Sequence, residues 1–471
     1  MPEQTLERPV DSEDGMFSRE YAAATTTFTA VMFLTGFAAM AVVPTLPTAA
    51  RALDGVSLFP VVAGCFVAAS LLGGVLGGHW ADRSGARRPL AAGMVLSVVT
   101  LLVSATSTSI GQLAAGRFVD GLAAGMVAVS VNTAIGQAYP EHLRPRMLAL
   151  MSTSWIIPSL VGPPLAGLVS EWWSWRVVFY GLAALSLLPA LALVVVLRGR
   201  SPAEAPAPSG DHPSRPPLLV AAALSLGAAL GQYGVSGWDV RHLLFVAVGL
   251  VLLVLLAPRL LPVGTWRAAR GLPATVLLRG LASGTYFTVE AFLPLMLITE
   301  RHIAAVVVGV AFTLSAVVWA GASWVQGRLL QDVPRHRLVS VGAGIMAASV
   351  VLAAAGALRG VPALAAAAAM PLAAVGMGLL DPCLTVLSLS HSPAGRQGYA
   401  SSAMQTNQNL GQITVMALFS AVLNTVLGLG AAELVGYGAA FALLLVPTLL
   451  IALLAVRARG SVSPRPLVEA R

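Results

Sequence analysis

Long apolar stretches alternate with short polar segments along almost the whole chain. A helix needs about 20 predominantly apolar residues to cross a bilayer. Fourteen stretches approach or exceed that length: 22–46, 58–79, 89–106, 111–138, 147–170, 177–197, 218–236, 241–261, 272–299, 304–330, 338–357, 362–390, 397–428 and 434–456. The pattern therefore predicts an all-α integral membrane protein with 14 transmembrane helices.

The arginines predict how these helices are oriented. The chain has no lysine, so all 28 basic residues are Arg. If the N-terminus is cytoplasmic, 21 of them fall in cytoplasmic segments and five in outer ones. Cytoplasmic loops of membrane proteins carry the excess of basic residues. We therefore expect both termini in the cytoplasm, an even number of spans and, since residues 1–20 lack a basic start before an apolar core, no cleaved signal peptide.

Composition narrows the class of protein further. The chain is 57% hydrophobic and 10% charged, whereas soluble domains carry about 25% charged residues. The net charge of +8 does not indicate nucleic-acid binding, because the arginines are scattered over short loops without a basic face. Both cysteines, Cys65 and Cys383, lie inside apolar stretches, so we expect buried core residues and neither a disulfide nor a metal pair.

A polar, proline-rich segment at 198–217 predicts a flexible linker between two bundles. A weak echo of segment 78–88 appears at 327–337, eight spans after the first copy. Two spans inserted after the linker would explain that offset from a six-span repeat. The expected parts are a cytoplasmic tail at 1–21, a six-helix bundle at 22–197, the linker at 198–217, two inserted helices at 218–261, a second six-helix bundle at 271–456 and a tail at 457–471.

Three carboxylates fall well inside the predicted spans. A charged side chain at the centre of a membrane helix costs about 2.5–3.5 kcal/mol on insertion scales, so such residues normally face the bundle interior or an aqueous cavity. Asp120 follows Arg117 by three residues, which places the two on one helix face as an ion pair. This pair either lines a pathway or only fixes packing beside the small residues Gly121 and Gly125.

Glu290 has no cation within one helical turn, and a buried carboxylate without a cation binds a proton readily. Its predicted depth matches that of Asp120, so we expect the two to meet across a central cavity; a core Glu with only local hydrogen bonds is the alternative. Asp381, which precedes Pro382, is either a third functional carboxylate or the cap of a broken helix. Arg279, near the start of its span, is expected to extend to the cytoplasmic interface.

Two further spans have unusual residues. The fifth contains Pro158, Gly162, Pro163, Pro164 and Gly167, and its prolines predict a bent helix suited to a gate or hinge. Segment 405–412 of the thirteenth contains five amides, including Asn407 and Gln408, and these predict an interhelical hydrogen-bonding face or a cavity wall. Trp155, Tyr286 and Phe287 are candidate substrate contacts, with core packing as the alternative.

The segment 78–88 resembles the loop signature of the major facilitator superfamily between its second and third spans. Six positions match it: Gly78, Asp82, Arg83, Gly85, Arg87 and Arg88. The Arg117 span and the Gly-Pro pattern of the fifth span look like the same superfamily. The resemblance implies two six-helix bundles that alternate in access, with the loop as a cytoplasmic latch. Within the superfamily, the predicted count of 14 spans resembles that of the drug:proton antiporter branch.

The resemblance implies a secondary transporter of the bacterial plasma membrane that exports hydrophobic or amphipathic compounds. It would use the proton gradient and no cofactor, with Glu290, Asp120, Arg117 and Asp381 in proton coupling. The expected partners are a small-molecule substrate, protons and membrane lipids, with a monomer as the working unit. An exporter of a lipid or glycolipid, or a metabolite transporter, is the alternative. The chain lacks the sequence motifs of common enzyme active sites, so an intramembrane enzyme is not expected.

Overall fold

In this computed structural model the described residues are 16–19, 21–140, 156–198, 218–237, 239–392 and 397–459, with five single positions between 141 and 155. They are almost entirely helical and contain no β-strand. The predicted all-α class is therefore confirmed.

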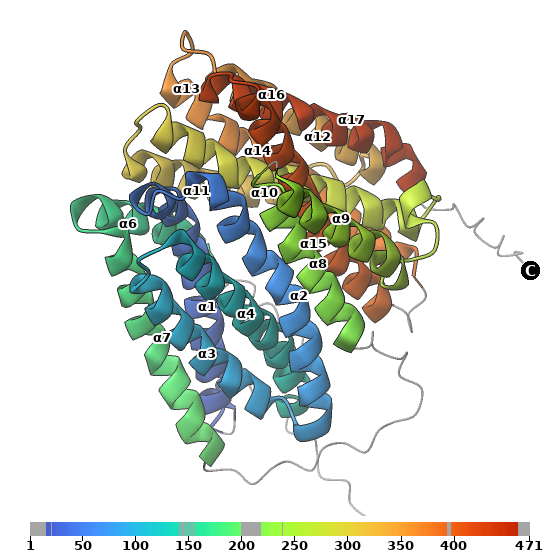
Figure 1. The fold of residues 1–471 in the computed structure, drawn as a ribbon. Helices are drawn as coiled ribbons and strands as arrows, with labels where there is room; N and C mark the ends of the chain where they lie inside the picture. Colours follow the sequence, from blue (N-terminus) through green and yellow to red (C-terminus); the bar gives the residue numbers. More distant parts are fainter. Residues whose placement is uncertain are drawn as a thin grey trace, which may run out of the picture.

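One group of helices comes from the N-terminal half of the chain, coloured blue to green in Figure 1. It consists of α1 (Ala22–Ala52), α2 (Phe59–Ser84), α3 (Arg87–Ala105), α4 (Ile110–Ala138), α6 (Ile156–Trp172) and α7 (Trp175–Arg198). Short 3-10 turns complete several helix ends, such as Val56–Leu58 before α2.

A second group comes from the C-terminal half, coloured yellow to red in Figure 1. It consists of α10 (Leu272–Thr299), α11 (Ala305–Arg328), α12 (Arg335–Gly356), α13 (Ala363–Ala367), α14 (Ala369–Ser390), α15 (Gln397–Gly428), α16 (Glu433–Leu443) and α17 (Leu445–Leu454). Helix α10 is the most enclosed of the candidate membrane spans, with 83% of its apolar window buried.

Two helices between the groups, α8 (Leu218–Gly234) and α9 (Val240–Leu256), form a pair beside α2. Helix α8 makes hydrogen bonds to both groups. The Ser225 hydroxyl donates to the carbonyl of Ala68 on α2, and Gln232 Nε2 donates to the carbonyl of Ile413 on α15 at 2.8 Å. The inserted pair therefore lies at the contact between α2 and α15.

Eleven helical segments within the described residues are long and apolar enough to cross a membrane, and Trp175–Leu191 and Leu218–Gly234 are shorter apolar helices. The helices follow the apolar stretches of the sequence closely. The part of the fifth stretch before residue 156 lies largely outside the described residues.

The polar segment 78–88, expected to connect the second and third spans as a loop, is mostly helical. Helix α2 continues to Ser84, and the chain turns at Gly85, whose φ of 78° favours glycine. Helix α3 begins at Arg87. Arg83 in the last turn of α2 and Arg87 at the start of α3 fit within helices, because a long side chain can carry its charge beyond the apolar region.

Glycines allow α4 to approach α2 closely. A Cβ atom added at Gly121 would lie 2.1 Å from the carbonyl oxygen of Phe66, and one at Gly125 would lie 2.2 Å from that of Ser70. The predicted small-residue face of α4 is therefore confirmed, and it faces α2.

The two groups contact each other near the C-terminal ends of α1 and α10. Arg51 donates to the carbonyl of Ile298 at 3.3 Å, and the backbone amide of Val306 donates to Glu171 Oε2 at 3.4 Å. The rings of Phe59 and Phe292 meet edge to face at the same end. We call this the closed end of the molecule.

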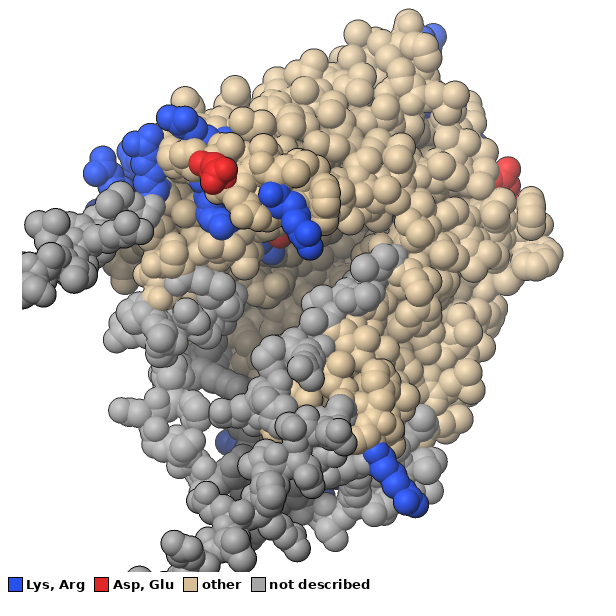
Figure 2. Space-filling model, turned by 180° about the vertical axis from the view of Figure 1, so that it is seen from behind, with Lys and Arg blue, Asp and Glu red and all other residues tan. Residues whose placement is uncertain are grey.

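Toward the opposite end, where α7 ends and α10 begins, the groups diverge. Figure 2 shows a hollow between them on the face seen from behind, with charged atoms visible in its wall. The described structure is thus closed at one end and hollowed between the groups, as an alternating-access transporter requires of one of its states.

Candidate functional site

A half-buried charge cluster joins three helices of the C-terminal group. Arg279 on α10 forms an ion pair with Asp381 on α14, and the two side chains are only 16% and 18% exposed. Gln408 on α15 accepts hydrogen bonds from Arg279 Nε at 3.0 Å and Nη2 at 2.9 Å. Arg279 Nη1 also donates to Thr385 Oγ1 at 3.2 Å. The cluster fixes the spacing of α10, α14 and α15 close to where α10 begins.

This arrangement corrects two predictions. Arg279 does not extend to an interface, because its guanidinium is held by Asp381, and an isolated carboxylate at that position would be costly. Asp381 does not cap a broken helix, because α14 runs through Pro382 to Ser390. The helix break lies earlier, between α13 and α14.

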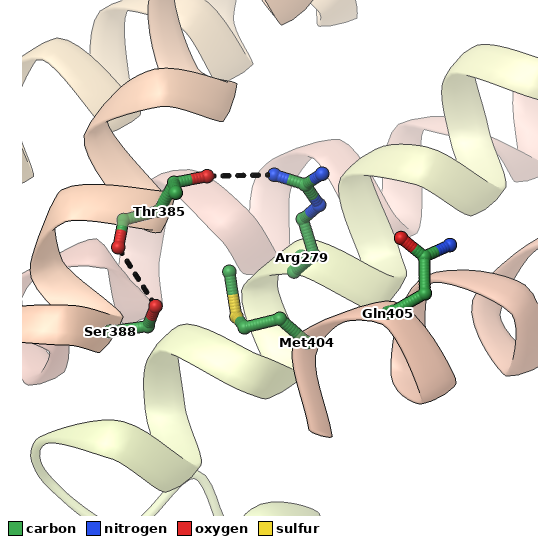
Figure 3. A pocket seen from close by; sticks show the side chains of 5 residues that line it. All are labelled: Arg279, Thr385, Ser388, Met404 and Gln405. Atoms are coloured by element: carbon green, nitrogen blue, oxygen red, sulfur yellow. Dashed lines mark hydrogen bonds between the residues drawn. The ribbon is translucent and has the colours of Figure 1, made fainter. Parts of the chain in front are cut away.

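A small, partly open cavity adjoins the cluster and is lined by Arg279, Thr385, Ser388, Met404 and Gln405. Figure 3 shows these side chains converging from α10, α14 and α15. The Ser388 hydroxyl donates to the Thr385 carbonyl at 2.8 Å. The cavity wall is therefore polar and cationic, with the thioether of Met404 as its soft apolar part.

Glu290 lies 11 residues further along α10, a separation of about 16 Å at 1.5 Å per residue. It is 8% exposed, and its Oε1 has no hydrogen-bond partner among the described residues. Tyr286, one turn earlier, is the polar neighbour with which the carboxyl interacts. No described residue forms an ion pair with Glu290. The predicted lack of a cation beside this carboxyl is therefore confirmed for the part of the chain that the structure describes.

Aromatic rings surround the same turn of α10. Tyr286 meets Phe287 and Trp319 edge to face, with centroid distances of 5.1 and 4.9 Å. Tyr286 is buried and Phe287 half-buried. These contacts place both predicted aromatic residues next to Glu290, and their contact with substrate stays a prediction.

The second buried pair lies within the N-terminal group. Arg117 Nη1 is 2.5 Å from Asp120 Oδ2, so the predicted pairing is confirmed. Ser97 on α3 donates to Asp120 Oδ1 at 3.3 Å, and the Arg117 guanidinium lies 4.2 Å over the ring of Phe66 on α2. These contacts hold the pair between α2, α3 and α4, and they do not bring Asp120 to Glu290 as the sequence had suggested.

Amides on α15 contact α10. Asn407 Nδ2 donates to the carbonyl of Val276 at 2.6 Å, and Gln408 accepts from Arg279. Gln405 lines the cavity. The predicted polar face of this span therefore serves as an interhelical hydrogen-bonding face and, at Gln405, as a cavity wall.

The Gly-Pro segment lies in α6, which runs through Pro163 and Pro164. A Cβ atom added at Gly309 on α11 would lie 2.6 Å from the Pro163 carbonyl, and one at Gly167 would lie 2.8 Å from the Ala305 carbonyl. Thr313 on α11 also donates to the Leu160 carbonyl at 2.8 Å. These residues form a close contact between the two groups, and Gly162 lies beside Ala41 of α1. Pro158 is buried near the start of α6.

Some predicted positions have no structural account here. Trp155 and the side chain of Asp82 lie outside the described residues. Arg83 and Arg88 are exposed and Arg87 is half-buried, so the latch remains a prediction. Both cysteines are free and buried, as predicted.

The sequence analysis did not predict three of the residues that line the cavity, namely Thr385, Ser388 and Met404. Asp381, Thr385 and Ser388 recur at helical spacing on α14, which is a signal for one polar face within an apolar span. Met404 carries no comparable signal, because an apolar residue in a membrane span predicts nothing about a cavity.

Structural comparison identifies the fold. The chain resembles a peptide transporter with bound alafosfalin (TM-score 0.67, 15% identity, 94% of this chain and 96% of that chain). It also resembles a bacterial homologue of the lysosomal transporter Spinster (TM-score 0.67, 14% identity, 95% and 100%).

Sequence comparison identifies the family. A probable multidrug-efflux transporter of Mycobacterium tuberculosis strain H37Rv is 27% identical over 401 residues, which are 81% of this chain and 83% of the relative. Multidrug resistance protein 1 of Bacillus subtilis is 27% identical over 159 residues, which are 33% of this chain and 40% of the relative. Residues 28–416 match the family description "Major Facilitator Superfamily". The chain is therefore a multi-pass membrane transporter, not an enzyme, and it belongs to the Major Facilitator Superfamily.

Proposed function

We propose that this transporter exports hydrophobic or amphipathic compounds in exchange for protons. The observation that carries the proposal is Glu290, a buried carboxyl without a cation partner on α10. The names of the relatives support efflux of small molecules. We further propose 14 spans in the bacterial plasma membrane, with both termini in the cytoplasm, as the arginine distribution favours.

With that orientation the described state is closed to the outside and hollowed toward the cytoplasm. Export requires the contacts at the closed end to separate, including the Arg51 bond to Ile298 and the edge-to-face pair of Phe59 and Phe292. The α6–α11 contact has glycines at its crossing, and these allow the two helix backbones to approach closely.

Protonation of Glu290 supplies the coupling in this mechanism. A charged carboxylate is costly in an apolar interior and favours the state in which water reaches it, whereas a neutral carboxyl does not. A proton taken up from outside therefore changes the relative stability of the two states. Release of that proton to the cytoplasm resets the preference, so the gradient drives substrate outward.

The test uses purified protein in proteoliposomes with an imposed pH gradient and a cationic, a neutral and an anionic dye. Wild type is expected to move at least one of them against its concentration gradient. Glu290→Gln should abolish this uphill movement while exchange of the same dye at equal pH continues. Asp239→Asn, at an exposed carboxylate that begins α9, is the control and should behave as wild type because Asn also caps helices.

Uphill transport that survives Glu290→Gln unchanged would remove this residue from coupling. Loss of both uphill movement and exchange would instead assign Glu290 to substrate passage. Protease protection of tags at the two termini tests the proposed orientation separately.

A further inference from the structure

We propose that the cavity beside Arg279 binds the anionic group of the transported compound, either a carboxylate or a phosphate monoester. This inference rests on the proposed transport of small molecules and narrows their class to amphipathic organic anions. The cavity lies between α10, α14 and α15.

The cavity presents the cationic side of the charge cluster. Arg279 is part of the lining, whereas Asp381 and Gln408 are not. No acidic side chain lines this cavity among the residues that the structure describes. A ligand entering the cavity therefore meets the guanidinium, while the carboxylate that compensates it lies behind.

Arg279 has capacity for one more acceptor. A guanidinium has five N–H donors. One N–H at Nε and one at Nη2 are directed to Gln408, one at Nη1 is directed to Thr385, and Nη1 forms the ion pair with Asp381. The remaining Nη2 donor is available, and rotation away from Asp381 would present a fork that matches a carboxylate or phosphate.

The rest of the lining suits the same ligand. Gln405 provides an amide with two N–H donors, and Met404 provides a polarizable wall for an apolar body. A cationic ligand would have no acidic partner in this lining. Asp381 balances the buried arginine when the cavity is empty, which avoids an uncompensated charge.

The N-terminal group contains a natural comparison. Arg117 and Asp120 form a similar buried pair, but the guanidinium lies over Phe66 and the carboxylate accepts from Ser97. An anion can therefore reach Arg279 from the cavity, whereas the ring of Phe66 covers Arg117.

The experiment measures binding by isothermal titration calorimetry to the full chain in a neutral detergent, without a pH gradient. The probes share one ring system: 2-naphthoate, 2-naphthyl phosphate and the neutral 2-naphthamide. Wild type should bind at least one anion about tenfold or more tightly than the amide, as expected for a hydrogen-bonded charge pair. The better of the two anions identifies the preferred group.

Variants locate the preference. Arg279→Gln should remove it, whereas Arg241→Gln, at an exposed arginine on α9, should leave it unchanged. Asp381→Asn should tighten anion binding several-fold, because it removes the carboxylate that competes for Arg279. A gain in affinity cannot result from misfolding, so this variant keeps the test decisive even if Arg279→Gln does not fold.

Equal binding of anions and amide by wild type would overturn the proposal. An anion preference that persists in Arg279→Gln would also overturn it, as would an anion affinity that does not rise in Asp381→Asn protein that still unfolds cooperatively. These results are separate from the dye assay. Dye export without anion preference leaves the proposed function standing, whereas anion binding without transport of any dye contradicts the proposed function instead.

Discussion

Replacement of Gly411 by alanine tests how tightly α10 and α15 are joined. A Cβ atom at this position would lie 2.0 Å from the carbonyl oxygen of Gly280, and ordinary contacts begin at 3.4 Å. The helices would have to separate locally by about 1.4 Å, the difference between those two distances. The obstructing atoms are backbone, so no side-chain rotation relieves the clash. Separation would also stretch the 2.6 Å hydrogen bond from Asn407 to the Val276 carbonyl.

Overpacking of this kind costs about 1–3 kcal/mol, and we expect Gly411→Ala near the upper end. The assay is the apparent unfolding midpoint in detergent at one fixed scan rate, because unfolding of large proteins is often irreversible. The midpoint should fall by several degrees. The control is Gly344→Ala on α12, where an added Cβ meets nothing within 4 Å and alanine favours the helix. A Gly411→Ala midpoint equal to that of wild type would refute the reasoning about this helix crossing.

Two further predictions concern charges. Arg279→Gln should destabilise the protein by about 3–5 kcal/mol because it leaves Asp381 without its partner. The double variant with Asp381→Asn should recover most of that loss. Equal unfolding midpoints for the single and double variants would contradict the ion pair. Asp239 caps α9, and its hydrogen bond with the His242 side chain lowers the pKa of that carboxyl. A lowered folded-state pKa means that the stabilisation is present above the unfolded value of about 3.9 and is lost as pH falls through the folded pKa. Hydrogen exchange of the first turn of α9 should therefore be faster in Asp239→Ala than in wild type at neutral pH, with the difference disappearing in acid.

The sequence predicted the helices well because the signal for a membrane helix is its length and composition. It also identified Asp120, Glu290 and Asp381, since a carboxylate in an apolar span is conspicuous. The Arg117–Asp120 pair could be predicted because its members are three residues apart on one helix. The partner of Asp381 could not, because Arg279 is on another helix and local spacing carries no information about that contact.

The expected meeting of Asp120 and Glu290 failed for a related reason. Equal depth in the membrane says nothing about which way a helix face points, and rotation of α4 is set by its packing. Gly121 and Gly125 bring α4 against α2, and this orientation directs Asp120 toward Ser97 on α3. Small residues near a buried charge therefore indicate which helix face touches a neighbouring helix. Depth in the membrane is a weaker guide to which residue is the partner of that charge.

The three carboxylates inside apolar spans differ in what a proton would do to each. Protonation of Asp120 or Asp381 would leave Arg117 or Arg279 buried without its counter-charge, a costly state. Glu290 has no such partner in the described structure, so a proton there removes a charge and creates none. In the proposed mechanism it is therefore the residue best suited to alternate between charge states. Because Arg279 lies on the same helix, a displacement of α10 would alter the proton site and the anion cavity together.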